Sequence, residues 1–371
     1  MKRILLIGQP ASSSGFLRHT IHALQKKGCE VVVLDAQARF WPKLWPTLRG
    51  FSFNRDTWYR RRWENNLYSP DAWRRNTRIN GKLLDQIRRP GDIILQMGKE
   101  YFPHPDFERM PYYLFLQSCL AIELRGGVAP WVPRKAEQPA FMDLERSLYQ
   151  SARTVFTGAR YVQDYMRRDY GVAPDRLALG GGGADDFFIE NMPAAPEVAS
   201  RKNMIMVGWD YGMKGGPTAV QALTLARKVI PDLTLTLVGP PLAEPPDTPG
   251  LIKIGPLRDR ARLLQLYREA DLFILPTLYD TFGFVICEAM SQGLPCISTD
   301  FNAIPELIEE GVNGYLVPRH DPVALAAKIV TYYADSGNRT RMGSASMRKV
   351  RERYTWDHVA DHLLAGMTET L

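Results

Sequence analysis

The sequence predicts an α/β protein of two domains, each built around a parallel β-sheet. Its 371 residues are about the length of two ordinary domains, and 45% of them are hydrophobic, which is enough for a core in each. The chain opens on an apolar stretch, a loop of small residues, a helical pattern and a second apolar stretch. A strand, a helix and a strand in succession indicate a parallel sheet whose ligand-binding loops lie at the carboxyl ends of its strands.

The first domain is expected to span residues 1–192. The pattern of apolar residues predicts its helices at residues 16–27, 141–150 and 159–169. Its strands are predicted at residues 3–7, 30–34, 92–96, 111–116 and 154–157. The loop at residues 8–15 lacks the GxGxxG pattern, so we do not expect a nicotinamide cofactor.

A stretch rich in Pro and Ala at residues 193–202 is the predicted linker to a second domain at residues 203–354. That domain begins with a strand at residues 203–207, and a Gly-rich loop that carries one lysine then opens a helix. Its other strands are predicted at residues 233–239, 251–254 and 272–276, and its other helices at residues 260–270, from 322 and from 338. Residues 355–371 are predicted to form a last helix.

Two carboxylates of the second domain, Asp280 and Glu288, stand eight positions apart and flank a Phe-Gly pair. Asp280 is expected on the loop after the strand at residues 272–276, and Glu288 inside the following helix. Gly283 lies near the helix start, where it leaves the first N–H groups free to bind an anion. Because ionised carboxylates accept hydrogen bonds from vicinal hydroxyls, this layout suits a nucleotide diphosphate sugar. The alternative is that Asp280 is a helix cap or a solvated loop residue.

The stretch at residues 276–318 resembles the C-terminal signature of glycosyltransferase family 4, the glycosyl transferases group 1. The family pattern runs Pro-Ser, Glu-x-Phe-Gly, Glu-Ala-Met, Gly-x-Pro-Val, Pro-Glu and Asn-Gly. This sequence matches it at Pro276, Phe282, Gly283, Glu288, Ala289, Met290, Gly293, Pro295, Pro305, Glu306, Asn313 and Gly314. The main departure is Asp280, where Glu is commoner in the family, so the carboxylate has one methylene less reach.

The resemblance implies the GT-B fold: two facing Rossmann-like domains with a C-terminal crossover helix at residues 355–371 that returns to the first domain. It implies a retaining enzyme of the hexosyltransferase type that moves a sugar from a nucleotide diphosphate sugar to an acceptor hydroxyl. The acceptor would bind the first domain, and glycan or polysaccharide biosynthesis is the expected setting. The alternatives are a non-catalytic nucleotide-sugar or glycan-binding module, and a retaining sugar phosphorylase or synthase on the same fold.

The resemblance also implies roles for individual residues. Lys214 matches a family lysine on the donor diphosphate, and Lys214 and Asp280 are the expected catalytic pair. Trp209 stands where the family has an arginine, and Arg258 or Arg260 are candidates to replace that cation. The expected donor-binding residues are Gly15, Lys214, Gly255, Leu257, Asp280, Thr281, Phe282, Gly283, Phe284, Val285 and Glu288. The family often has a histidine where this chain has Gln117 and Ser118, so no histidine role is carried over.

Residues 39–89 form a basic segment, with thirteen Lys and Arg against four Asp and Glu, and five of the eight tryptophans. Its net charge is therefore 13 − 4 = +9, whereas the whole chain carries +7. One interpretation is a surface for an anionic or lipid-linked acceptor or an anionic membrane, with candidates Trp58, Arg60, Arg61, Arg62 and Trp63. The alternative is a solvated basic face whose tryptophans pack inward. Nucleic acid is not expected, because no nucleic-acid motif accompanies the charge.

Metal and redox chemistry have no evident residues in the sequence. No Asp-x-Asp occurs, the cysteines have no CxxC spacing, and His358 and His362 lack a third ligand, so we expect neither a metal nor a cofactor. The cysteines in apolar surroundings indicate a reducing compartment. With neither a signal peptide nor an apolar run of membrane-span length, the expected location is cytoplasmic, with peripheral binding at the inner face of the membrane as an option.

Overall fold

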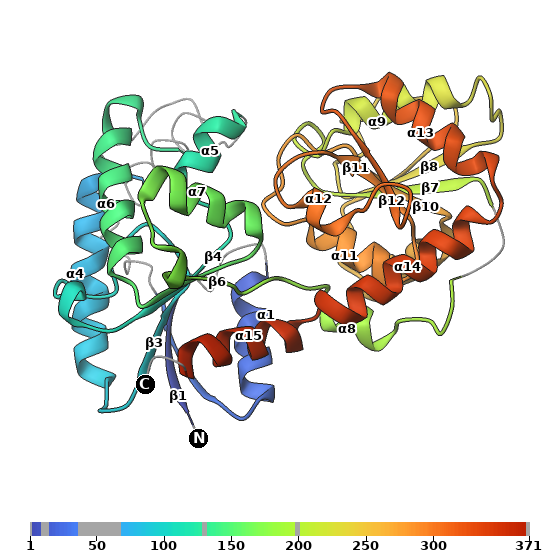
Figure 1. Cartoon of the computed structure of the whole chain (residues 1–371). Coiled ribbons are helices and arrows are strands. Elements are labelled where there is room, and N and C mark those ends of the chain that lie inside the picture. The colour runs from blue at the N-terminus through green and yellow to red at the C-terminus, as the bar shows by residue number, and fades with distance from the viewer. Residues whose placement is uncertain (1, 9–14, 36–67, 128–131, 197–200, 369–371) are drawn as a thin grey trace. The chain divides into compact units, whose positions relative to one another are not determined.

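The computed structural model describes residues 2–8, 15–35, 68–127, 132–196 and 201–368. The chain divides into two compact units, Met1–Gly181 with Asp357–Leu371, and Gly182–Trp356 (Figure 1). Both units alternate strands and helices, so the predicted α/β class with two parallel sheets is confirmed.

The first unit contains a six-stranded parallel sheet in the order β2-β1-β3-β4-β5-β6. Its strands are β1 (Arg3–Gly8), β2 (Glu30–Asp35), β3 (Ile93–Gln96), β4 (Tyr113–Leu116), β5 (Thr154–Thr157) and β6 (Leu177–Leu179). Its helices are α1 (Phe16–Lys26), α4 (Pro70–Ile87), α5 (Leu120–Gly126), α6 (Gln138–Ser151) and α7 (Arg160–Tyr170). Strands β3, β4 and β5 are buried along their whole length, as expected for a parallel sheet covered on both faces.

The second unit repeats this architecture in the order β12-β11-β10-β7-β8-β9. Its strands are β7 (Asn203–Val207), β8 (Thr234–Val238), β9 (Leu251–Gly255), β10 (Leu272–Leu275), β11 (Cys296–Thr299) and β12 (Gly314–Val317). Its helices are α8 (Asp186–Glu190), α9 (Gly216–Ala226), α10 (Arg260–Glu269), α11 (Phe284–Ser291), α12 (Ile304–Leu307), α13 (Pro322–Ala334) and α14 (Asn338–Arg353). The chain reverses direction across the sheet between β7 and β10, and such a reversal opens a crevice at the carboxyl ends of the two strands.

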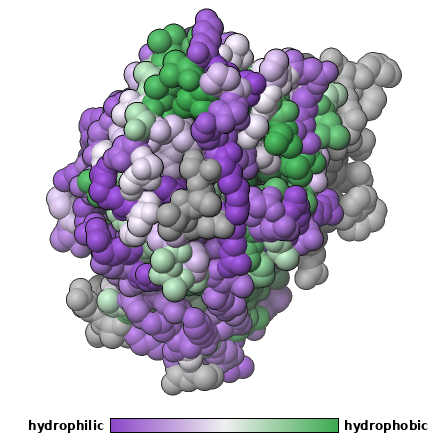
Figure 2. Space-filling model, turned by 90° about the vertical axis from the view of Figure 1, so that its right-hand side faces the viewer, coloured by the Kyte–Doolittle hydropathy of each residue, from purple (hydrophilic) through white to green (hydrophobic). Residues whose placement is uncertain are grey.

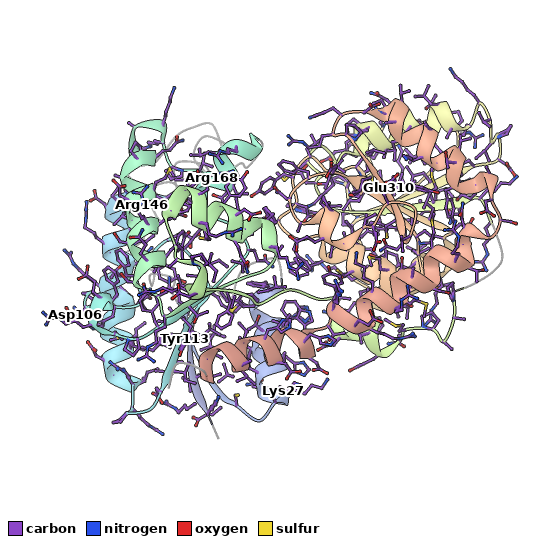
Figure 3. All side chains as sticks on the ribbon, viewed as in Figure 1. Lys27, Asp106, Tyr113, Arg146, Arg168 and Glu310 are labelled. Carbon is purple, nitrogen blue, oxygen red and sulfur yellow. The ribbon has the colours of Figure 1, made fainter. Side chains whose placement is uncertain are left out.

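The last helix, α15 (Trp356–Thr368), packs with the first unit. Lys26 Nζ lies 2.9 Å from Asp357 Oδ2. Lys27, which is labelled in Figure 3, has its Nζ 2.6 Å from Asp361 Oδ1. The Tyr113 hydroxyl of β4 donates to the carbonyl of Met367, at 3.3 Å. The C-terminal helix therefore completes the unit in which the chain begins.

The unit boundary differs from the boundary we expected at residue 192. The segment that starts at Gly182 packs with the second unit: Ala184 N donates to the carbonyl of Tyr354 at 3.0 Å, and Gln292 Nε2 to that of Phe188 at 2.8 Å. A Cβ on Gly182 would lie 2.7 Å from the ring of Phe282, so this position has no room for a side chain. The glycine cluster is thus used for close packing at the start of the second unit.

Part of the basic segment is helical. Ser69 caps α4 by accepting from Ala72 N at 3.2 Å, and Pro70 occupies the first helical turn, where its missing N–H costs nothing. Trp73 on α4 is fully buried, edge-on to Phe102 and Phe141 with ring centroids 5.2 and 5.1 Å away. For Trp73 the inward-packing alternative is confirmed. Trp58, Arg60, Arg61, Arg62 and Trp63 lie outside the described residues.

On the face that Figure 2 shows, the described residues are mainly hydrophilic, and hydrophobic residues form separate patches. None of the helices in the described ranges combines the length and the apolar composition that a bilayer span needs. The exposed large apolar side chains include Trp209, which is 80% exposed on the loop after β7. Because Trp is rarely so exposed, this position contrasts with the buried Trp73.

Candidate active site

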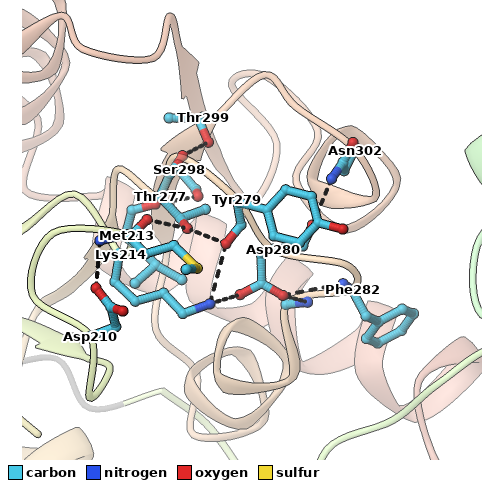
Figure 4. Close-up of polar contacts among 12 residues, drawn as sticks. Asp210, Met213, Lys214, Thr277, Tyr279, Asp280, Phe282, Ser298, Thr299 and Asn302 are labelled. Atoms are coloured by element: carbon cyan, nitrogen blue, oxygen red, sulfur yellow. Dashed lines mark hydrogen bonds and ion pairs between the residues drawn. The ribbon is translucent and has the colours of Figure 1, made fainter. Parts of the chain in front are cut away.

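Lys214 and Asp280 lie together at the carboxyl edge of the second sheet. Lys214 follows β7 and Asp280 follows β10, and these two strands are neighbours. The Lys214 Nζ lies 2.8 Å from Asp280 Oδ2 (Figure 4), and the two side chains are only 20% and 13% exposed. The structure therefore brings the expected pair into direct contact at the point where the strand order reverses.

Glycines let the loop after β7 place Lys214. A Cβ on Gly208 would lie 2.9 Å from Lys214 Cγ, so the absent side chain leaves room for the lysine stem. Gly215 has a positive φ of 77°, and a Cβ there would lie 1.9 Å from the carbonyl oxygen of Pro276. Asp210 Oδ1 accepts from Met213 N at 2.7 Å and closes the turn (Figure 4). The direction of the lysine is therefore set by two backbone positions that leave little room for a side chain.

The Asp280 carboxylate also accepts hydrogen bonds at the start of α11. Its Oδ1 accepts from Phe282 N at 3.2 Å and from Gly283 N at 2.8 Å. Gly283 precedes the first residue of α11 with a φ of 97°, so glycine suits the position. The expectation that Asp280 is on a loop and Glu288 in a helix is confirmed. The alternative of a helix cap holds for Oδ1, which accepts from the two backbone amides, whereas Oδ2 forms the ion pair with Lys214.

Buried hydroxyls join the loops that carry the pair (Figure 4). The Thr277 Oγ1 lies 3.2 Å from the carbonyl of Met213 and 2.9 Å from that of Tyr279. Thr299 Oγ1 donates to the carbonyl of Thr277 at 2.8 Å, which ties the end of β11 to the end of β10. Asn302 Nδ2 donates to the Asp280 carbonyl at 3.0 Å. Because these bonds are largely shielded from water, they hold the ion pair in one geometry.

Glu288 lies on α11 in an environment that favours its neutral form. The Tyr267 hydroxyl donates to Glu288 Oε2 at 3.3 Å. Burial, together with the nearby charge of Asp185, raises the pKa of Glu288 to about 8, and the Tyr267 hydrogen bond and the charge of Arg260 offset only part of this. A neutral carboxyl can both donate and accept a hydrogen bond, so it matches a hydroxyl that needs both.

The cations near the site differ in availability. Arg260, one of two expected replacements for the arginine at the Trp209 position, is bound by Asp185 through two hydrogen-bonding nitrogens, at 3.1 and 3.0 Å. Arg258 is exposed. Sequence reasoning missed Arg319, whose Nη1 donates to the carbonyl of Leu278 at 3.2 Å and whose guanidinium lies 3.9 Å from the ring centre of Phe301. Its position two residues after the apolar stretch Gly314–Val317 was the signal that could have found it.

The other expected donor residues fall in two groups. Gly255, buried with a φ of 75°, ends β9 and the half-buried Leu257 follows it, while residues 281–285 surround the start of α11. Gly15 belongs to the first unit, where it precedes α1 with a φ of 64°. Within the described ranges, no three His, Cys, Asp or Glu side chains are placed to hold a metal ion.

Comparison with known proteins connects these features to a family. Residues 201–335 match the family model of the glycosyl transferases group 1. A D-inositol 3-phosphate glycosyltransferase of Xylanimonas cellulosilytica is 29% identical over 179 residues, which is 48% of this chain and 37% of that protein. The chain thus matches little more than a third of the length of this relative.

Two solved structures share the architecture of the whole chain. The sucrose-phosphate synthase of Thermosynechococcus elongatus has a TM-score of 0.69 at 18% identity, and covers 100% of this chain and 98% of its own. The Anabaena protein HepE, in complex with UDP, has a TM-score of 0.68 at 16% identity and full coverage of both chains. At this identity the likeness establishes the fold. Residues 201–335 therefore match the glycosyl transferases group 1, and the chain has the two-domain GT-B fold of Rossmann-like units.

Proposed function

We propose that this chain is a retaining glycosyltransferase of the hexosyl type, which moves a sugar from a nucleotide diphosphate sugar to an acceptor hydroxyl. The observation that carries the proposal is the Lys214–Asp280 pair, on loops that follow the adjacent strands β7 and β10, within residues 201–335 that match the glycosyl transferases group 1. HepE is in complex with UDP, so a UDP-sugar is the first donor to test.

The positive charge at this edge suits a departing diphosphate. The Lys214 ammonium and the first N–H groups of α11 are fixed before the reaction, so they stabilise developing negative charge with little reorganisation. We therefore propose metal-independent chemistry, with the nucleotide sugar as a co-substrate and no cofactor. The second unit would bind the donor and the first unit the acceptor, with residues 193–202 as the linker and α15 as the crossover helix.

Glu288 and Asp280 take different roles in this proposal. Glu288 contacts the ribose hydroxyls, whereas Asp280 contacts the sugar and holds Lys214. Gly15, Lys214 and residues 281–285 contribute to the diphosphate and sugar site, and Gly255 and Leu257 lie beside the nucleobase. The Asp280 oxygens already accept from one ammonium and two amides, which weakens this carboxylate as a nucleophile. We propose that the acceptor attacks from the leaving group's own face and that a diphosphate oxygen takes its proton.

The test is nucleotide release from a panel of UDP-sugars with and without candidate acceptors. Lys214→Ala should lower kcat/KM by about 100-fold or more, the usual cost of one group that stabilises a developing anion. Lys228→Ala, an exposed lysine just beyond α9, is the matched control and should behave as wild type. Equal turnover of the two variants would contradict the assignment of Lys214 to the diphosphate site.

The same assay separates the alternatives. Saturable UDP-sugar binding without any UDP release would indicate a binding module instead. Release of a sugar phosphate that requires inorganic phosphate would indicate a phosphorylase.

We also propose that the acceptor is a glycan or lipid-linked molecule in glycan or polysaccharide biosynthesis, and that the basic segment at residues 39–89 binds an anionic membrane surface. The support is its net charge of 13 − 4 = +9 and its tryptophans. Sedimentation with vesicles of phosphatidylglycerol and phosphatidylcholine, compared with phosphatidylcholine alone, tests this. Charge reversal at Arg60, Arg61 and Arg62 should abolish the difference, whereas no binding at low salt would contradict the proposal.

A further inference from the structure

The first unit contains a cavity of about 250 Å³ at the carboxyl ends of β3 and β4. Its apolar part includes Phe16, Leu17 and Phe115, and its polar part Lys99, Glu100 and Gln117. Pockets for drug-sized ligands usually range from roughly 300 to 1,000 Å³. This cavity is therefore large enough for a single ring and too small for an extended ligand.

The aromatic side of the cavity is rigid. The rings of Phe16 and Phe115 lie 4.6 Å apart between centroids, and both side chains are buried. A Cβ on Gly180 would lie 2.4 Å from the Phe115 ring, so glycine at this position lets the ring fill its place. A rigid aromatic surface contacts the C–H face of a ring at little conformational cost.

None of the described residues that line the cavity offers a spare positive charge. Lys99 is the cation among the described lining residues, and its Nζ lies 2.6 Å from Glu123 Oε1 and 3.7 Å from Glu145 Oε1. Glu100 adds another carboxylate, which accepts from the Lys99 backbone N–H at 3.0 Å. One ammonium therefore faces several carboxylates.

Glu145 is itself fixed from its other side. It accepts from Leu120 N at 3.1 Å and from the Tyr170 hydroxyl. Lys99 cannot turn to a ligand without leaving these buried carboxylates unpaired, which is costly. A phosphate, which needs an available cation, is thus disfavoured in this cavity.

Gln117 offers a neutral hydrogen-bond donor instead. Its Nε2 is buried and has no hydrogen-bond partner within the described part of the chain. A buried donor without a partner is unfavourable, so a ligand oxygen that accepts from Gln117 would be bound selectively. Glu100 is half-buried at the same cavity and can accept from a hydroxyl.

We propose that this cavity binds an uncharged, hydroxyl-bearing sugar ring of the acceptor and discriminates against a ring that carries a phosphate. That the ring belongs to an acceptor rests on the proposed transferase function. That the cavity recognises a neutral ring rests on the cavity alone. It differs from what the name of the D-inositol 3-phosphate relative would suggest for this chain. A charged part of a larger acceptor would bind elsewhere.

The experiment measures ring binding by the full-length protein without a donor. Saturation-transfer NMR is recorded with the methyl α-glycosides of glucose, mannose and galactose, and with the corresponding hexose 6-phosphates. At least one glycoside should bind, with a Kd at least tenfold below that of its phosphate. Gln117→Ala should raise that Kd about fivefold, the typical effect of one lost hydrogen bond. Gln25→Ala, on the exposed side of α1, is the matched control.

Two further variants test the charge argument. Glu100→Gln should reduce the difference between glycoside and phosphate, and Glu108→Gln, an exposed carboxylate nearby in sequence, should leave it unchanged. Tighter binding of a hexose phosphate, binding of no glycoside, or equal behaviour of the Gln117 and Gln25 variants would overturn the proposal. Glycoside binding that depends on Gln117 without turnover of any UDP-sugar would leave the cavity assignment standing while the transferase function fails.

Discussion

Both units are built on a six-stranded parallel sheet, yet the lysines at their two carboxyl edges have different partners. Each sheet reverses its strand order once, between β1 and β3 in the first unit and between β7 and β10 in the second. In the second unit Lys214 pairs with one carboxylate, that of Asp280, which lies on the loop before α11. In the first unit Lys99 is 7% exposed in its side chain and is surrounded by carboxylates. The carboxyl edges thus carry a lysine with one carboxylate partner in the second unit and a lysine with two carboxylate partners in the first.

Burial explains why the two lysines differ. A lysine that keeps some contact with water can exchange its carboxylate for a diphosphate at modest cost. A lysine that is fully enclosed pays the desolvation of every charge it leaves behind. The same residue type is therefore a proposed ligand-binding group at Lys214 and a structural counter-ion at Lys99.

The largest expected effect is on the free energy of unfolding, which should fall more when Lys99 is replaced than when Lys214 is replaced. Lys99→Met leaves Glu123 and Glu145 buried without their cation and should lower the free energy of unfolding by about 3–5 kcal/mol. Lys214→Met should cost less than half as much, because Asp280 keeps its two backbone amides. Urea denaturation followed by circular dichroism measures both. A Lys99 variant as stable as the Lys214 variant would contradict the contrast.

A second prediction concerns the acid that pairs with Lys214. Asp280→Asn keeps the size of the side chain and removes its charge, so Lys214 loses its anchor while the fold is retained. We expect kcat/KM for the UDP-sugar to fall at least tenfold, with a smaller loss for Asp280→Glu, which keeps the charge. Equal losses in the two variants would show that shape rather than charge matters at this position.

The pH dependence of stability should involve both units. Burial raises the pKa of Glu145 to about 7, and burial with Asp185 raises that of Glu288 to about 8, from a usual 4.5. Because the folded state binds these protons more tightly, their contribution to stability is full below about pH 4.5. It falls as pH rises through about 7 to 8.

Glu288→Gln and Glu145→Gln should each flatten this decline, since an amide does not titrate. Urea midpoints between pH 5 and pH 8.5 measure the effect, which is at most about 1.4 kcal/mol per pH unit for each group. A wild-type protein whose midpoint rises over this interval would contradict the assignment of raised pKa values.

The smallest effect is expected at the surface of the first unit. Lys26 and Asp357 form an ion pair with side chains 57% and 47% exposed. Lys26→Met should change the free energy of unfolding by less than about 1 kcal/mol, because water and salt screen such pairs. Raising the salt concentration should reduce even this difference. A loss of unfolding free energy comparable with that of Lys99→Met would mean that solvent exposure does not determine how much these ion pairs stabilise the fold.

Much of the framework could be predicted because local patterns carry it. The apolar runs identified most strands of the first sheet, and the Gly-rich loop identified the turn that holds Lys214. Short strands such as β6 and β12 were missed, because three or four residues show too little periodicity to separate a strand from a loop. The start of the second unit was placed too late, because the packing of Gly182 against Phe282 involves residues that are distant in sequence.

By itself, the sequence determined the α/β class, the two-unit plan and the identity of the residues around Asp280, since these follow from composition, periodicity and a local signature. Only the tertiary structure decided which groups are in contact. Asp280 pairs with Lys214 across 66 positions, Arg260 is bound by Asp185, and Lys99 is neutralised by Glu123 and Glu145. Charge availability depends on burial and on partners brought together by folding, and no local pattern of residues encodes either.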